Sequence, residues 1–223
     1  GFITFNKKLD KDVTFDEVKK TILEFNENKN VDGILLQLPL PKHLDTESLL
    51  DLIDPKKDVD GLHPKNQGLL QKGRASLIPC TPLGSLKLNK IEKKDLSGVN
   101  AVVVGRSILV GKPMATLLLD RNATVTVVHS RTKDIEVICA NADVLVAAVG
   151  REALVKKDWV KEGAIVIDVG INRNEKGKLC GDVDYDSVLP KVSAITPVPG
   201  GVGPMTVAML MLNTLNAYLE SSN

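Results

Sequence analysis

The chain contains 223 residues, 43% of them hydrophobic, and its 29 Lys and Arg residues nearly balance its 28 Asp and Glu residues. That length allows one large domain or two smaller ones, while a net charge of +1 removes the usual electrostatic argument for binding nucleic acid or an anionic membrane. No apolar run approaches the roughly 18 residues of a membrane-spanning helix. We therefore expect a soluble protein with neither nucleic-acid nor membrane partners.

The cysteines indicate which cellular compartment the protein occupies and whether it binds a metal. Cys80, Cys139 and Cys180 are odd in number and widely spaced, with no Cys-x2-Cys pair. This spacing predicts neither a disulfide framework nor a metal site, and it favours a reducing compartment such as the cytoplasm, with an organelle left open. Cys80 is interpreted as a buried small hydrophobic residue, with a reactive thiol as the alternative.

Residues 1–79 are predicted to form a separate α/β region. Apolar residues recur near helical spacing in residues 14–30 and predict a helix. The apolar run VDGILLQLPLP, residues 31–41, predicts a buried strand that ends at Gln37. Because ligands bind at the carboxyl ends of strands in sheets of this kind, Gln37 is a candidate site residue.

An acidic pair follows in the stretch KKDVDGLHPKNQG. Asp58 and Asp60 precede a glycine, and two interpretations stay open. Their carboxylates accept hydrogen bonds from local amides in a turn, or they belong to a binding site.

Residues 78–90, IPCTPLGSLKLNK, carry two prolines and a glycine where the sequence pattern changes. Such residues are typical of a hinge or domain boundary. The predicted division is therefore residues 1–79 for the first domain, 80–195 for the second, and 196–223 for a loop and helix that end the chain.

From Val99 onward, short β-branched runs alternate with helical stretches. Continuous apolar strands joined by helices predict a parallel sheet covered on both faces, a doubly wound α/β domain. The strands are predicted at 101–105, 124–129, 143–150 and 164–170, and the helical stretches between them at 112–120, 132–141 and 156–163.

The first strand leads into a candidate phosphate-binding turn, AVVVGRSILVGKP. Gly105 ends the strand, and Gly111 precedes Pro113, a residue suited to the first turn of a helix. Glycines would let the backbone approach a pyrophosphate at the positive end of that helix. The spacing departs from Gly-x-Gly-x2-Gly, so an ordinary turn between strand and helix is the alternative.

The end of the second strand points to the identity of the dinucleotide. NAD-binding domains usually place an acid there to bind the ribose 2′-hydroxyl. This sequence has His129, Ser130 and Arg131 instead, and Arg106 follows the first glycine. Positive charge and hydrogen-bond donors suit the 2′-phosphate of NADP. The alternative is that these are ordinary solvent-exposed residues at the end of a strand.

Near the end of the chain, PVPGGVGPMT packs three prolines and three glycines into residues 197–204 and runs directly into a predicted helix. Glycines permit a backbone path close to a ligand, and prolines stiffen that path. Six motifs in this order, QLPLP, KDVDGLHPKNQG, PCTP, VVGRSILVGKP, TVTVVHSRT and ITPVPGGVGPMT, resemble the bifunctional methylenetetrahydrofolate dehydrogenase/cyclohydrolase family over nearly the whole chain.

The resemblance implies an NADP-binding Rossmann-like doubly wound sheet, a smaller N-terminal α/β folate domain, and a C-terminal helix that returns to the first domain. Tetrahydrofolate substrates would bind in a cleft between the domains, and the protein would be a homodimer in one-carbon metabolism and purine biosynthesis. Carried over by motif, the catalytic and folate residues are Gln37 and Asp60, with Pro199, Gly200 and Gly201 also at the substrate. The NADP residues are Gly105, Arg106, Ser107, Gly111, His129, Ser130, Arg131 and Val202.

The resemblance also implies two steps, hydride transfer to NADP⁺ and hydrolysis of the methenyl product to 10-formyltetrahydrofolate. The family assigns proton transfer in the second step to a lysine in a Tyr-x3-Lys motif just before a strand. Gly1–Ile3 resembles the start of that strand, so we expect the motif upstream of Gly1 in a longer protein. The alternatives are a monofunctional dehydrogenase and a folate- or NADP-binding protein without turnover.

Overall fold

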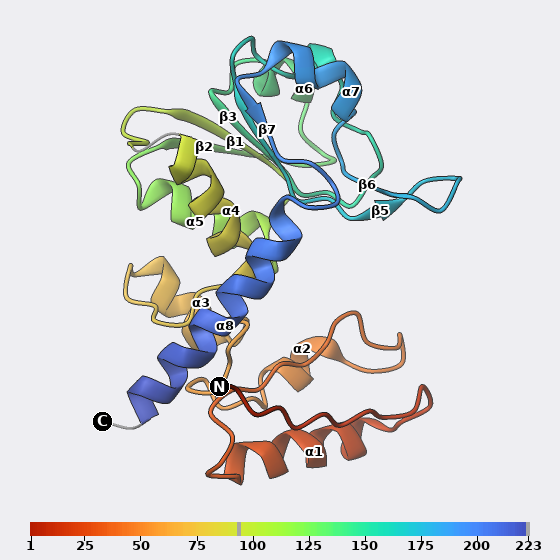
Figure 1. Ribbon diagram of the computed structural model, residues 1–223, viewed down its shortest axis with the longest axis vertical. Coiled ribbons are helices and arrows are strands. Elements are labelled where there is room, and N and C mark those ends of the chain that lie inside the picture. The colour runs from red at the N-terminus through yellow and green to blue at the C-terminus, as the bar shows by residue number, and fades with distance from the viewer. Residues whose placement is uncertain (93–94, 222–223) are drawn as a thin grey trace.

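The computed structural model describes residues 1–92 and 95–221. Figure 1 shows a parallel sheet with its covering helices at one end of the molecule and helices α1 and α2 at the other, with α8 running between the two ends. We refer to residues 1–79 as the N-terminal region and to residues 95–195 as the sheet region.

The central sheet has five parallel strands in the order β2-β1-β3-β4-β7. Because β2 and β3 lie on opposite sides of β1, the direction of winding reverses between β1 and β3, where doubly wound sheets bind their ligands. The strands are β1 (Asn100–Val104), β2 (Thr124–Val128), β3 (Val144–Ala147), β4 (Ile165–Asp168) and β7 (Ala194–Ile195).

Alternate residues of each strand enter two different cores. In β1, Val103 packs on one face of the sheet with Met114 and Leu118, whereas Val104 packs on the other with Cys139 and Val188. This period of two confirms the predicted doubly wound sheet. The first face is covered by α4 (Cys80–Glu92) and α5 (Gly111–Leu119), and the second by α6 (Ile135–Cys139) and α7 (Tyr185–Val188).

The four strands predicted from Val99 onward are confirmed as β1 to β4, but several short elements after β3 differ from expectation. Residues 156–163, predicted as helical, contain only a short 3₁₀ turn at Lys157–Trp159. A hairpin of β5 (Asn172–Arg173) and β6 (Leu179–Cys180) was not predicted, nor was the 3₁₀ turn at Leu189–Lys191. These elements are two or three residues long, too short to produce a period in the sequence.

The N-terminal region is built from helices around its own apolar cluster. The helix predicted in residues 14–30 is α1 (Phe15–Glu27), which begins with a capping box between Thr14 and Glu17 and buries Val18 and Ile22. Two further helices, α2 (Thr46–Leu50) and α3 (Pro64–Gln71), follow it along the chain.

Both strands predicted in the N-terminal region are wrong. Gly1–Ile3 has no regular structure, and Ile3 is 83% exposed. Residues 31–41 are extended, but only Ile34 pairs, through one isolated bridge to Asp58. An apolar run becomes a strand only when a partner strand lies beside it, and the described part of the chain offers this run a single bridge.

Residues 78–90, predicted as a hinge or domain boundary, lie mostly in a helix, because α4 occupies residues 80–92. The predicted boundary between residues 79 and 80 falls at the start of this helix and stays a prediction. Pro82 lies in its first turn, where the missing N–H of proline leaves no hydrogen bond unmade. The glycine of this segment, Gly84, instead serves packing against α8 (Val202–Ser221), since a Cβ there would lie 3.0 Å from the Cβ of Met205.

The helix predicted after PVPGGVGPMT is α8, and it returns to the N-terminal region as expected. Asn213, 1% exposed, donates from Nδ2 to the carbonyl oxygens of Val59 and Ile78, each at 2.8 Å. The Ser76 hydroxyl donates to Glu220 near the end of the helix, at 3.3 Å. The side-chain amide of Asn213 therefore joins α8 to two separate loops of the N-terminal region.

This bridge can be tested with Asn213→Asp, which keeps the shape but turns a carboxylate toward two carbonyl oxygens. Leaving buried acceptors without donors should lower the free energy of unfolding by about 3 kcal/mol, measured by urea denaturation. Asn216→Asp on the same helix is the control, and we expect it to cost less than about 1 kcal/mol. Equal losses in both variants would show that the bridge does not anchor α8.

Candidate functional site

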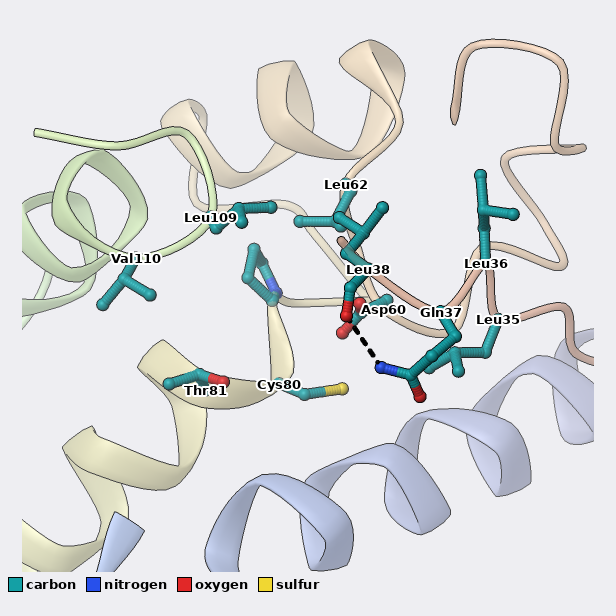
Figure 2. Close-up of a pocket in the computed structure, with 11 residues that line it drawn as sticks. Leu35, Leu36, Gln37, Leu38, Asp60, Leu62, Cys80, Thr81, Leu109 and Val110 are labelled. Atoms are coloured by element: carbon teal, nitrogen blue, oxygen red, sulfur yellow. Dashed lines mark hydrogen bonds between the residues drawn. The ribbon is translucent and has the colours of Figure 1, made fainter. Parts of the chain in front are cut away.

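A cavity of about 180 Å³ lies where the N-terminal region meets the loop after β1. Four separate segments build its wall, so the folded chain brings together residues that are far apart in sequence (Figure 2). The lining residues are Leu35, Leu36, Gln37, Leu38, Asp60, Leu62, Pro79, Cys80, Thr81, Leu109 and Val110.

The turn that presents Asp60 is fixed by its neighbours. Lys57 donates from Nζ to the carbonyl oxygens that end α1, at 2.8 Å for Asn26 and 2.9 Å for Asn28. Asp58, 2% exposed, accepts from the backbone N–H of His63 and from Asn66 Nδ2, both at 2.8 Å. Asp58 is therefore the local turn residue of the acidic pair, while Asp60 faces the cavity.

Gly61 brings this turn close to the start of α4. Its φ of +69° lies in the left-handed region, and a Cβ there would lie 2.6 Å from the backbone nitrogen of Pro79. The Cys80 thiol donates to the carbonyl oxygen of Val59 at 3.3 Å. Only glycine permits this approach, which places Asp60 and Cys80 in the same wall.

Burial controls the ionisation of both groups. Loss of water raises the pKa of Asp60, and the nearby charge of Asp58 adds to the effect, while a hydrogen bond with Cys80 opposes it. Burial and the charge of Asp60 raise the pKa of the Cys80 thiol, which therefore stays protonated. This supports the interpretation of Cys80 as a buried packing residue rather than a reactive thiolate.

Gln37 reaches the cavity from the extended segment of residues 31–41. Its Nε2 donates to the carbonyl oxygen of Leu38 at 3.0 Å, and its side chain is otherwise exposed (Figure 2). The structure thus brings Gln37 and Asp60 into one cavity, although their contact with a substrate stays a prediction.

The predicted dinucleotide residues gather at the carboxyl edge of the sheet. Gly105 follows β1 with a φ of +120°, and a Cβ there would lie 2.2 Å from the carbonyl oxygen of Ala148. A Cβ at Gly111 would lie 2.3 Å from the carbonyl oxygen of Gly105. Both glycines are required by close backbone packing, which draws the start of α5 tightly against the end of β1.

Between these glycines, Arg106 and Ser107 have exposed side chains. The Ser107 hydroxyl oxygen accepts from the backbone N–H groups of Val110 and Gly111, at 3.1 and 3.4 Å. The Ser107 hydroxyl therefore partly caps the start of α5. The remaining N–H groups at the start of a helix are free to bind an anion.

At the end of β2, residues 129–132 form a turn. The backbone N–H of His129 donates to the Thr132 hydroxyl at 2.9 Å, and His129 Nδ1 accepts from the backbone N–H of Arg131 at 3.2 Å. With Nδ1 as acceptor, the neutral ring carries its proton on Nε2. The side chains of Ser130 and Arg131 are exposed.

The loop of residues 197–201 follows β7 and leads into α8. Gly200 has a φ of +101°, and a Cβ at Gly201 would lie 2.5 Å from the carbonyl oxygen of Pro197. Pro199 and Gly200 are exposed, whereas Val202 is buried. This loop follows a strand of the same parallel sheet as Gly105 but does not line the cavity that holds Gln37 and Asp60.

Several residues at or near the site were not predicted from the sequence. Leu109 and Val110 line the cavity from the loop after β1. Asp168 and Asp182 are buried at the carboxyl edge, 2% and 0% exposed, and they accept hydrogen bonds from the loops there. An acid at the end of the apolar run IVID was the one signal available for Asp168, while Asp182 lay in no recognised pattern.

Among residues 1–92 and 95–221, no group of three or more His, Cys, Asp or Glu side chains is arranged to hold a metal ion. No helix in the same residues is long and apolar enough to cross a membrane.

The sheet order, the glycine turn after β1 and the cavity beside it define a dinucleotide-binding protein of the Rossmann type with an attached N-terminal region. Family models agree and are more specific. The catalytic domain of tetrahydrofolate dehydrogenase/cyclohydrolase matches residues 1–60, and the NAD(P)-binding domain of the same family matches residues 79–222. The chain belongs to the tetrahydrofolate dehydrogenase/cyclohydrolase family.

Individual relatives support the assignment. The chain is 56% identical to bifunctional protein FolD 2 of Paracoccus denitrificans, over all of this chain and 74% of that protein. A crystal structure of the bifunctional FolD enzyme from Campylobacter jejuni has a TM-score of 0.91 at 50% identity, covering 95% of this chain and 76% of that one. The Trypanosoma brucei enzyme, complexed with NADP cofactor and inhibitor, has a TM-score of 0.90 at 40% identity over 96% and 75%.

Proposed function

We propose that the protein oxidises 5,10-methylenetetrahydrofolate with NADP⁺ and hydrolyses the methenyl product to 10-formyltetrahydrofolate. Family membership supports both activities. The observation that carries the proposal is the cavity itself, in which Gln37 and Asp60 lie opposite the loop after β1. One-carbon metabolism feeding purine biosynthesis, in the cytoplasm, is the setting that we propose for this activity.

The residues at the sheet edge fit NADP. Gly105 and Gly111 let the start of α5 pack against the end of β1, so the N-terminus of this helix is available to a pyrophosphate at the edge of the sheet. The exposed side chains of Arg106 and Arg131 supply positive charge. His129, rather than an acid, follows β2, so no carboxylate repels a 2′-phosphate there. When bound, NADP⁺ accepts a hydride from the one-carbon bridge of the folate.

The cavity residues would bind and orient the pterin. A carboxylate can accept two hydrogen bonds, so Asp60 would bind adjacent N–H groups of the ring, with Gln37 beside it. Burial, with a smaller effect from the charge of Asp58, raises the pKa of Asp60, and donors from a ligand would favour its charged form again. Leucines at positions 36, 38 and 62 line the same wall and exclude water from the ring.

The hydrolytic step requires a group that moves a proton. The described lining of the cavity contains neither lysine nor histidine. We propose that the lysine of a Tyr-x3-Lys motif, as in the family, supplies it. The lining favours one alternative, a monofunctional dehydrogenase, which would form the methenyl product without hydrolysing it.

An absorbance assay for formation and decay of methenyltetrahydrofolate tests the function. Asp60→Asn should lower kcat/KM for the folate about 100-fold, because hydrogen bonds to a charged group contribute about 1.5–3 kcal/mol each. The KM for NADP⁺ should stay within about threefold. Asp186→Asn, at an exposed position on α7, is the control and should match the parent chain. Absence of any methenyl product with the full-length parent protein would refute the function.

Cofactor preference is tested with Arg131→Ala. Loss of a charged contact to the 2′-phosphate should lower kcat/KM for NADP⁺ by about 10- to 100-fold and leave the value for NAD⁺ nearly unchanged. Arg121→Ala, at an exposed position beyond α5, is the control. Equal or better turnover of NAD⁺ than of NADP⁺ by the parent enzyme would contradict the assignment.

We further propose a homodimer in which the two copies pair through β2. This strand is the edge of the sheet, and its Val127 is 38% exposed. Beside it, Leu119 at the end of α5 is 62% exposed. An open edge strand with apolar neighbours suits antiparallel pairing with the same strand of a second copy, which a two-fold axis allows.

Val127→Lys should convert the dimer to a monomer, because a charge on an edge strand opposes pairing. Sedimentation velocity measures the outcome. Val137→Lys, at a residue of α6 that is 61% exposed, adds the same charge away from β2 and should leave the dimer intact. Dissociation by both substitutions would contradict an interface at β2.

A further inference from the structure

Two buried carboxylates join loops at the carboxyl edge of the sheet, and neither belongs to the cavity. Asp168 is the last residue of β4, and Asp182 follows β6. They are 2% and 0% exposed, so their charges require hydrogen-bond donors. The described structure provides such donors to both groups, mostly backbone N–H groups.

Asp182 binds the loop after β3. Its Oδ2 accepts from the backbone N–H groups of Val149, at 2.6 Å, and Gly150, at 3.0 Å, and its Oδ1 accepts from that of Arg151 at 2.9 Å. Oδ1 also accepts from Asn172 Nδ2 at 2.9 Å, which connects Asp182 to the start of β5. Three successive N–H groups around one carboxylate form the kind of concavity that binds an anion, here filled by the protein itself.

Asp168 in turn fixes Asp182. Its Oδ1 accepts from the backbone N–H of Asp182 at 2.9 Å, and its Oδ2 accepts from that of Val183 at 3.0 Å. A Cβ at Gly170 would lie 2.3 Å from Asp182 Oδ1, so Asp182 leaves no space for a side chain at residue 170. Burial raises the pKa of Asp168 to about 6, an effect that its N–H donors oppose.

The loop that Asp182 binds forms one side of the crevice where the winding reverses. β3 pairs directly with β1, and the loops after these strands lie side by side. The contact is close, because a Cβ at Gly105 would lie 2.2 Å from the carbonyl oxygen of Ala148. Any shift of residues 148–151 therefore changes the space beside the glycine turn proposed for the dinucleotide.

We infer that Asp182 is a positioning residue for NADP, which holds residues 149–151 against the glycine turn through backbone hydrogen bonds, and this inference rests on the proposed function. Asp168 orients Asp182 for that task. Because the carboxylate already satisfies these N–H groups in the free protein, the cofactor does not have to order the loop when it binds.

Asp182→Asn tests the inference. The amide keeps the shape but turns an N–H₂ group toward backbone donors, so part of the loop loses its acceptor. We expect about a tenfold rise in the KM for NADP⁺ and a matching loss of affinity for NADPH, followed by the fluorescence of the nucleotide, while kcat and the KM for the folate change less than about threefold.

Asp143→Asn is the matched control. Its carboxylate also accepts a backbone N–H, that of Asn100 at 2.9 Å, but it precedes β3 at the opposite edge of the sheet. This variant should lose stability without a change in the KM for NADP⁺. Equal effects of the two variants on this KM would overturn the inference, because a general loss of stability would then explain both.

A second measurement covers the case in which Asp182→Asn does not fold. Hydrogen exchange of the parent protein should show the N–H groups of residues 149–151 protected before NADPH is added. Protection that arises only with NADPH would overturn the inference, since the cofactor would then order the loop.

The two proposals can fail separately. If the parent protein binds no NADPH, the proposed function fails. If it binds but the Asn variant binds equally well, only the role of Asp182 fails.

Discussion

The arrangement of the cavity depends on one side-chain amide, that of Asn213. Its Nδ2 joins the carbonyl oxygens of Val59 and Ile78, which immediately precede Asp60 and Pro79 in the wall of the cavity. Without this amide, the Val59 carbonyl would keep only the Cys80 thiol as a donor within the described part of the chain, and the Ile78 carbonyl would lose its donor, so the amide stabilises the packing of the helix on both loops. Asn213, 154 positions away from Val59 in sequence, therefore helps to set the position of Asp60, the carboxylate that we propose binds the substrate.

The same physical device recurs at the sheet edge. Asp182 satisfies three backbone N–H groups, as Asn213 satisfies two backbone carbonyls, and Lys57 satisfies the carbonyls that end α1. In each case backbone groups that no helix or strand satisfies receive their hydrogen bonds from a buried or half-buried side chain. The loops at the cavity and at the sheet edge are thus held by specific hydrogen bonds although they have no regular structure.

The sequence predicted the sheet well because β-branched runs such as AVVV need only their own local pattern to be recognised. It predicted Gln37 and Asp60 in one site through their motifs, and the cavity brings them together. The prediction of a strand failed for residues 31–41. Their apolar side chains indicated a strand, but strand formation also requires a pairing partner elsewhere in the sequence, and in the described structure only Ile34 has one, through its bridge to Asp58. Asp182 could not be found for a related reason, since its donors lie some 30 residues away and acquire meaning only in three dimensions.

The pairing of α4 with α8 has a consequence for how ligands enter. The segment whose prolines indicated a hinge is a helix, and Gly84 lets it pack directly on α8 near Met205. Two packed helices therefore join the N-terminal region to the sheet region directly, beside the cavity that Cys80 and Thr81 of α4 line. A ligand that enters this cavity meets the first turn of α4, so the packing of the two helices sets the position of part of the wall around it.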